Sequence, residues 1–128
     1  MVFYVVTICC PKVVLNDLAR CDMAEAVEDA FRYNKIIFAT TTYNAEIFPY
    51  MREFINHLTE RNYSNRTVAF IENGSWAPLA AKIMKGMLEK SKNLAYTETT
   101  VRILSALNDE SLSQVDALAE ELCREYLA

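Results

Sequence analysis

Two polar segments of the chain carry the side chains that could bind a ligand. The first, residues 40–46, includes Thr40, Thr41, Thr42, Tyr43 and Asn44 and directly follows an apolar run. Its hydroxyls, its amide and the free backbone N–H groups of a following helix could bind a planar heterocycle and its ribityl or phosphate oxygens. In an open parallel sheet, ligands bind beyond the carboxyl ends of the strands, and a segment after a strand lies there.

The second segment, residues 72–77, follows a later apolar run and contains Asn73, Gly74, Ser75 and Trp76. Glycine permits a tight turn, and the indole ring offers a flat surface for stacking. From spacing alone, residues 41–44 are also compatible with an ordinary polar turn in which Thr42 or Asn44 caps the next helix. Trp76 is likewise compatible with a packed or half-exposed surface aromatic. The functional interpretation predicts that both segments form one cofactor-binding site.

Composition excludes several other kinds of site. The chain has 128 residues and only 2 glycines, Gly74 and Gly86, whereas dinucleotide and triphosphate loops need several glycines close together. A Rossmann site and a P-loop are therefore excluded. The 4 cysteines form no C-x-x-C pair and the chain has 1 histidine, so neither zinc spacing nor a disulfide framework is supported. We predict no metal site and no catalytic residue.

Charge and hydropathy limit the kinds of binding partner and the cellular compartment that we expect for the protein. Lys and Arg number 13 against 17 Asp and Glu, a net charge of −4, so no basic surplus points to nucleic acid. The longest apolar stretch, residues 2–10, is about half as long as a bilayer span and has none of the flanking features of a signal peptide. We expect no membrane association and a cytoplasmic location with reduced thiols.

Apolar runs and helical periodicity alternate along the chain. Strands are expected at residues 2–8, 13–18, 35–40, 67–71 and 95–104, and helices after an Asp22 N-cap, from about residue 48, from Pro78 and over residues 111–126. In the last helix the residues expected to face the core are Leu112, Val115, Leu118, Ala119 and Leu122. The pattern predicts a three-layer α/β/α sandwich around a five-stranded, mostly parallel sheet.

The N-terminal strand is atypical. About four residues separate it from the second strand, which is too few for a helical crossover of a dozen or more. The chain therefore begins either with a hairpin or with an α/β fold that has lost its first strand–helix unit.

Both polar segments lie in motifs that resemble a known family. ATTTYNAEIFP, residues 39–49, resembles the G-S-P-T-Y-N-x-x-I-F-P stretch in the flavodoxin-like domain of A-type flavoproteins, the flavo-diiron proteins. AFIENGSWAPLAAKIMKGML, residues 69–88, is similar to that family's A-F-G-S-Y-G-W-S-G-x-A loop and following helix. The closing VRILSALNDESLSQVDALAEEL also follows the family's ending. The resemblance implies a single flavodoxin-like domain over residues 1–128, with residues 1–12 as the atypical strand and 13–128 as the family-like region.

The resemblance implies a cofactor and a partner. In that family the domain binds FMN non-covalently and passes electrons to a diiron site on another domain. Carried over, Thr42, Tyr43 and Asn44 would flank the isoalloxazine, and Gly74 with Trp76 would border its other side. The chain would then be a redox carrier domain rather than a complete enzyme, acting with a redox partner protein or a diiron domain.

The sequence departs from the family at the phosphate end of the cofactor. The family begins with a hydroxyl-rich S-x-Y-G-N-T loop that holds the FMN phosphate at a helix N-terminus, and residues 7–11 stand in its place. Thr41 replaces the proline of P-T-Y-N, while Ile71 and Glu72 replace the expected Gly-Ser, which would put a negative charge near the cofactor.

Two functions follow from these observations. One is an FMN-binding electron-transfer module. The other is a flavin-free, degenerate domain that acts as an interaction or homodimerisation module, because an N-terminal strand without its covering helix would expose apolar surface or a sheet edge.

Overall fold

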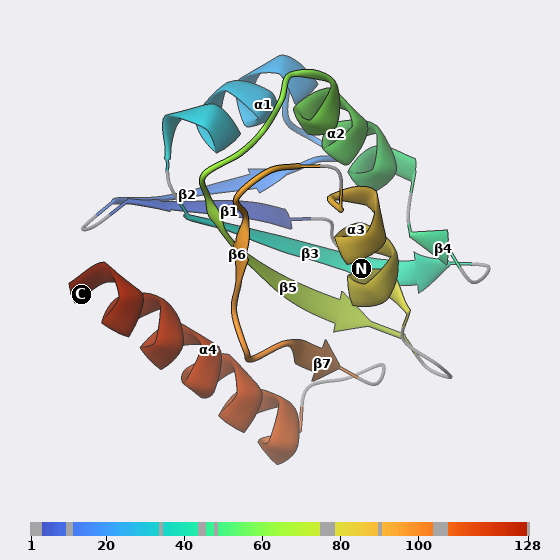
Figure 1. The fold of residues 1–128 in the computed structure, drawn as a ribbon. Helices are drawn as coiled ribbons and strands as arrows, with labels where there is room; N and C mark the ends of the chain where they lie inside the picture. Colours follow the sequence, from blue (N-terminus) through green and yellow to red (C-terminus); the bar gives the residue numbers. More distant parts are fainter. Residues whose placement is uncertain are drawn as a thin grey trace.

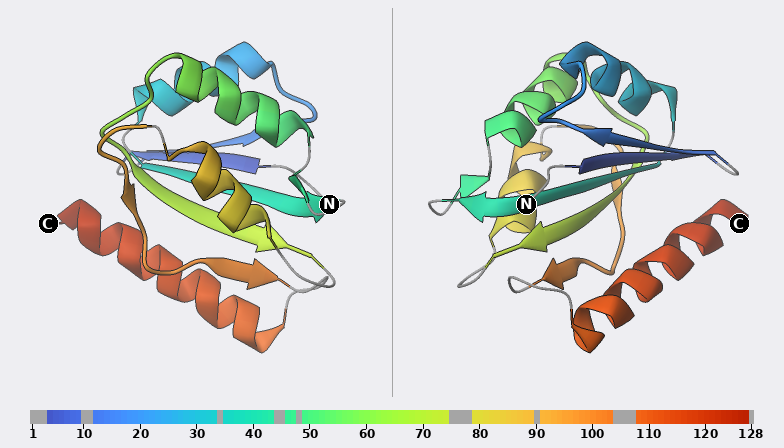
Figure 2. Two further views of the ribbon diagram at one scale, coloured as in Figure 1. Left: turned by 45° about the vertical axis from the view of Figure 1, so that its right-hand side comes forward. Right: turned by 180° about the vertical axis from the view of Figure 1, so that it is seen from behind.

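A β-sheet runs through the middle of the molecule, with helices on both of its faces (Figures 1 and 2). The computed structural model describes residues 4–9, 12–33, 35–43, 46–47, 49–74, 79–89, 91–103 and 108–127. The elements in chain order are β1 Tyr4–Cys9, β2 Lys12–Asp17, α1 Met23–Arg32, β3 Lys35–Tyr43, β4 Glu46–Ile47, α2 Pro49–Glu60, β5 Thr67–Asn73, α3 Ala80–Met87, β6 Ala95–Tyr96, β7 Val101–Ile103 and α4 Asp109–Leu127.

The strands occupy five positions in the order β2-β1-β3-β5-β6, with β7 also paired to β5 and β4 to β3. β3 and β5 are parallel, and β6 and β7 both pair with β5 in parallel, so the expected fifth strand is present but split in two. β2 runs in the same direction as β3, because β1 is antiparallel to both of them. Four of the five positions therefore share one direction, which confirms the predicted three-layer, mostly parallel α/β architecture.

β1 is the reversed strand, and it forms a hairpin with β2. Cys9 pairs with Lys12, so two residues connect the strands, and a connection this short joins only antiparallel strands. Of the two alternatives for the N-terminus, the hairpin is therefore the one found. Ile8 pairs with Lys35 at the start of β3, whereas Tyr4 pairs with Ala39 near its end. The segment around Ile8 and Cys9 consequently lies at the edge of the sheet opposite the one at which β3 ends.

Two strands continue into segments that we expected to be loops. β3 extends through Thr41 to Tyr43, and its last residues pair with β4 through Thr42↔Ile47 and Tyr43↔Glu46. Threonine and tyrosine fit well in strands, and the two-residue link to β4 is the usual length for a hairpin. The loop expected from residue 41 is thus wrong in its first part, and β5 likewise continues to Asn73.

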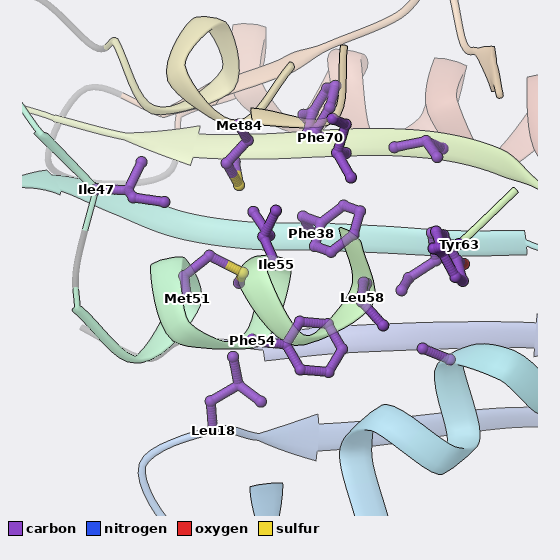
Figure 3. Packing of buried hydrophobic residues seen from close by; sticks show 14 of the residues in the cluster. Leu18, Phe38, Ile47, Met51, Phe54, Ile55, Leu58, Tyr63, Phe70 and Met84 are labelled. Carbon is purple, nitrogen blue, oxygen red and sulfur yellow. The ribbon is translucent and has the colours of Figure 1, made fainter. Parts of the chain in front are cut away.

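The main hydrophobic core lies between the sheet and helices α1, α2 and α3 (Figure 3). Phe38 of β3 is central, because its ring lies 6.0 Å from that of Phe70 on β5 and 6.1 Å from that of Phe54 on α2. The apolar face predicted for α2 is confirmed, since its four members are fully buried: Met51, Phe54, Ile55 and Leu58. This core holds β3 and β5 in register up to the edge at which they end.

Helix α4 covers the opposite face and packs against β7 and β5 (Figure 2). Leu118 and Leu122 face inward as expected, and Lys35 Nζ donates to the carbonyl of Leu122. Leu112 and Val115, however, are 50% and 37% exposed, and Ala119 is exposed as well, so their expected burial is wrong. The reason is that α4 rests on the sheet along a narrow strip. Nowhere in the described residues is a helix long and apolar enough to cross a membrane.

Candidate functional site at the carboxyl edge of the sheet

The two predicted site segments meet at one edge of the sheet, where β3, β5 and β7 end; we call it the carboxyl edge (Figure 1). The register pairs Thr40 with Glu72 and Thr41 with Asn73, so the ends of β3 and β5 are direct neighbours. β3 continues beyond this point through Thr42 and Tyr43. Two segments far apart in the sequence thus arrive side by side, as a shared binding site requires.

Thr40 contributes a buried hydroxyl to this edge. Its side chain is fully buried, and Oγ1 has no hydrogen-bond partner in the described part of the protein. A buried hydroxyl without a partner costs about 1–3 kcal/mol, so such groups are rare in folded proteins and often mark functional positions. Thr40 thus places a hydroxyl whose donor and acceptor are both unused by the described residues at the end of β3.

Glu72 occupies the neighbouring position on β5 and is 1% exposed. Its Oε1 accepts a hydrogen bond from the backbone N–H of Ala81 at 3.1 Å, in the first turn of α3. Its Oε2 accepts one from Arg102 Nε on β7, also at 3.1 Å. The negative charge that we expected near the cofactor is thus balanced by a guanidinium and a helix N-terminus.

Arg102 is the residue of this edge that sequence analysis missed. It belongs to β7, whose register places it opposite Glu72. Its backbone N–H donates to Gln114 Oε1 at 2.7 Å, which fixes β7 to α4. The alternation Val101-Arg102-Ile103 could have indicated a strand with Arg102 on one face, but no local pattern reveals which strand it pairs with.

The remaining predicted residues divide into two groups. Asn73 is partly buried at the end of β5, and the Gly74 N–H donates to the carbonyl of Ile103 at 3.1 Å, which ties β5 to β7. No described glycine has a positive φ, so Gly74 does not use the left-handed conformation. Asn44, Ser75 and Trp76 lie outside the described residues. The ring-flanking roles implied for Asn44 and Trp76, like those of Thr42, Tyr43 and Gly74, remain predictions.

A hollow of about 360 Å³ adjoins the edge between α3 and the β6–β7 segment. Its lining includes Glu72 and Arg102 together with Lys82, Lys85 and Tyr96. Lys85 is engaged there, because its Nζ lies 4.9 Å from the centre of the Tyr96 ring. Metal ligation is not indicated, since within the described ranges no three His, Cys, Asp or Glu side chains gather into a site.

The turn between β2 and α1 reaches the same edge and is rich in carboxylates. Asp17 Oδ1 accepts from the N–H of Ala19 at 3.0 Å, and the Asp22 N-cap accepts from the N–H of Ala24 at 3.0 Å. Burial of the thiol, reinforced by the carboxylates of Asp17, Asp22 and Glu25, raises the pKa of Cys21 above its ordinary value of 9.0. The local potential at the start of α1 is therefore negative.

The edge fits one part of a flavin nucleotide and not the other. The paired ends of β3 and β5, with the unpartnered Thr40 hydroxyl on β3, suit the polar rim of a planar ring. A phosphate would require free backbone N–H groups or cations in place of the phosphate loop, and the reversal of β1 takes that position away. Thr7 and Ile8, which stand in the place of that loop in the sequence, pair with Ile36 and Lys35 and so lie toward the opposite edge of the sheet.

Comparison with known proteins shows the fold. No family model matches the chain, and no curated protein does. Rubredoxin oxygen:oxidoreductase (ROO) from the anaerobe Desulfovibrio gigas superposes with a TM-score of 0.78 at 15% identity, covering 85% of this chain and 27% of that one. A flavodoxin from the domain Archaea superposes with a TM-score of 0.73 at 13% identity, covering 87% of this chain and 75% of that one. The chain thus has a flavodoxin-like fold, and it spans about a quarter of the length of the oxidoreductase.

Proposed function

We propose that the chain is a flavin-binding electron-transfer domain of the flavodoxin kind, with FMN as the reference ligand. The observation that carries this proposal is the register Thr40↔Glu72 and Thr41↔Asn73, which brings both predicted site segments to one edge. The flavodoxin-like fold supports it, because open α/β sheets bind ligands beyond the carboxyl ends of their strands.

In this proposal the protein binds and orients the ring while the flavin, when bound, supplies the one- or two-electron chemistry. Thr40–Tyr43 on β3, and Asn73 at the end of β5 with Gly74 after it, would flank the ring from two sides. The Thr40 hydroxyl would donate to or accept from a polar ring atom. The Glu72–Arg102 pair would keep the net charge beside the ring near zero, so that the electron-rich ligand meets no uncompensated carboxylate.

A redox partner completes this function. We propose a second protein or domain with a metal centre, such as a diiron domain, that exchanges electrons with the ring. The net charge of −4 favours a partner with a basic docking surface.

Titration of flavin fluorescence tests the proposal. We expect FMN fluorescence to be quenched with a Kd at or below about 50 µM. Thr40→Val removes the hydroxyl while keeping the shape of the side chain, so it should weaken binding about fivefold and raise the stability of the free protein by about 1 kcal/mol.

Thr67→Val is the matched control, because Thr67 lies at the other end of β5, where that strand begins. It should leave flavin affinity unchanged. Absence of quenching by wild-type protein at about 50 µM would contradict the proposal. Equal loss of affinity in the two valine variants would contradict the role of Thr40.

A second candidate function is a flavin-free module that binds another copy of this chain. Leu15 on β2 is 59% exposed, and β2 ends the strand order. Asn16 Nδ2 bonds to Asp29 Oδ2 of α1 at 3.2 Å, so Leu15 lies on the face that α4 shares. α4 packs against β5 and β7 rather than β2, so it leaves Leu15 uncovered.

Light scattering distinguishes this candidate from the first. A dimer of wild-type protein that Leu15→Lys converts to a monomer would support it, with Leu112→Lys on α4 as the control for an exposed leucine elsewhere. A wild-type protein that stays monomeric at about 100 µM would contradict it.

A further inference from the structure

Two features of the chain determine which part of a flavin the carboxyl edge can hold: the direction of β1 and the occupancy of the helix N-termini. β1 is antiparallel to β3, with Ile8 opposite Lys35. Lys35 and Thr40 are five residues apart, so the end of β1 is about 17 Å from the ring-binding position. No loop leaving β1 can deliver N–H groups to a phosphate there.

The helix that begins at the carboxyl edge nearest β1 is α1, and its N-terminus already holds a carboxylate. Asp22 Oδ1 accepts a hydrogen bond from the N–H of Ala24 at 3.0 Å, and Glu25 lies in the first turn of α1. Asp17 adds a third negative charge in the same turn, next to Cys21. Arg20 Nε lies 3.8 Å from Asp17 Oδ2, so a phosphate placed here would face three carboxylates and one guanidinium, an excess of negative charge.

The other helix at this edge, α3, is occupied in the same way. The buried Glu72 carboxylate accepts a hydrogen bond from the Ala81 N–H through one oxygen and one from Arg102 Nε through the other. α2 begins at Pro49, which has no backbone N–H to offer. Within the described residues, the starts of α1 and α3 at this edge are therefore filled by carboxylates of the chain, and the start of α2 offers one N–H fewer than an ordinary helix start.

We infer that the carboxyl edge binds the ring of a flavin without using its 5′-phosphate, so that riboflavin is as good a ligand as FMN. This inference rests on the proposed flavin-binding function. It follows from the placement of the Thr40 hydroxyl at the ring position and of Asp17, Asp22, Glu25 and Glu72 where phosphate donors would be needed.

Parallel titrations of the whole chain with riboflavin and FMN test the inference. The two Kd values should agree within about threefold, whereas several charge-assisted hydrogen bonds to a phosphate would make FMN at least about 100-fold tighter. FMN more than about tenfold tighter than riboflavin overturns the inference and leaves the proposed function standing. Binding of neither flavin overturns both.

The dependence of FMN affinity on ionic strength gives a second test, because its sign differs between a carboxylate-rich site and a site with cationic phosphate donors. Because Asp17, Asp22 and Glu25 outnumber Arg20 at the start of α1, added salt should leave riboflavin affinity unchanged and slightly tighten the binding of FMN between about 10 and 150 mM. A site with cationic phosphate donors would instead lose FMN affinity as salt rises, and that result overturns the inference.

Lys82→Ala is the control for a phosphate held by surface charge, because exposed Lys82 lines the neighbouring hollow. We expect the ratio of the FMN and riboflavin Kd values to stay the same. A loss of more than about threefold for FMN alone overturns the inference.

Discussion

Removing either partner of the Glu72–Arg102 ion pair should destabilise the protein, but by different amounts. Glu72 is 1% exposed and holds two hydrogen bonds of 3.1 Å, whereas the Arg102 side chain is 57% exposed. Removing the arginine leaves the buried carboxylate with the Ala81 N–H as its one remaining partner among the described residues. Removing the charge of the glutamate leaves an arginine that can turn to water. The first change should therefore cost more than the second.

The expected magnitudes follow from this geometry. Breaking a buried pair by deleting one partner costs about 3–5 kcal/mol, and since Glu72 keeps its bond to Ala81, we expect about 3 kcal/mol for Arg102→Met. Glu72→Gln keeps an acceptor for the Ala81 N–H and leaves no unpaired charge in the core, so we expect a loss of stability of about 1.5 kcal/mol. The double variant contains no buried charge and should be about as stable as Glu72→Gln.

Urea denaturation followed by circular dichroism at pH 7 measures the free energy of unfolding of all three variants. In thermal unfolding, each kcal/mol lost should lower Tm by about 3–4 °C. The double-mutant cycle should give a coupling of about 3 kcal/mol. Effects that add within about 0.5 kcal/mol would refute the reasoning, because they would mean that the carboxylate does not depend on the arginine. A smaller loss for Arg102→Met than for Glu72→Gln would refute it too.

Three further outcomes follow from other contacts. Burial raises the pKa of Tyr63 well above its ordinary 10.0, and its hydroxyl has no partner in the described residues. The contribution of the neutral tyrosine to stability should thus be complete below pH 10 and be lost as the pH rises above it. Tyr63→Phe should be about 1 kcal/mol more stable at pH 7. Denaturant unfolding measured at a series of pH values should show a smaller alkaline loss of stability in this variant. Alkylation of Cys21 at pH 8, followed by peptide mass spectrometry, should be slower than that of a free thiol, because its pKa is raised by burial and three carboxylates. Arg66→Lys should cost about 2 kcal/mol in thermal unfolding, because Arg66 donates to the Tyr33 and Phe31 carbonyls at 3.0 and 2.9 Å and covers the Tyr63 ring, a set that lysine cannot reproduce.

Local signals in the sequence were sufficient for the helices and for the order of the elements. The spacing of Met51, Phe54, Ile55 and Leu58 predicted the buried face of α2, and Asp22 caps α1 as its residue type indicated. These features depend on neighbours within one turn, so periodicity and capping preference reveal them. The meeting of the two site segments also followed from the rule for carboxyl ends of parallel strands.

Features that depend on register between distant strands were not predictable. Glu72 was recognised as an unusual residue, but its partner Arg102 lies 30 positions along the chain and meets it only because β7 pairs with the end of β5. The exposure of Leu112 has a similar origin. Helical spacing shows that it shares a stripe with Val115, yet only the width of the surface beneath α4 decides how much of that stripe is buried.

The direction of β1 shows how a short connection can change a site while the strand order survives. Only Cys10 and Pro11 separate β1 from β2, and so short a link imposes an antiparallel pair. β1 still takes the position between β2 and β3, where it pairs with both strands. A parallel strand there would end beside Thr40 and bring its following loop to the ligand, but the reversed strand ends beside Lys35 instead. The carboxyl edge is thus assembled from β3 and β5 without the loop that a forward β1 would supply. The FMN and riboflavin titrations measure the consequence of this reversal directly.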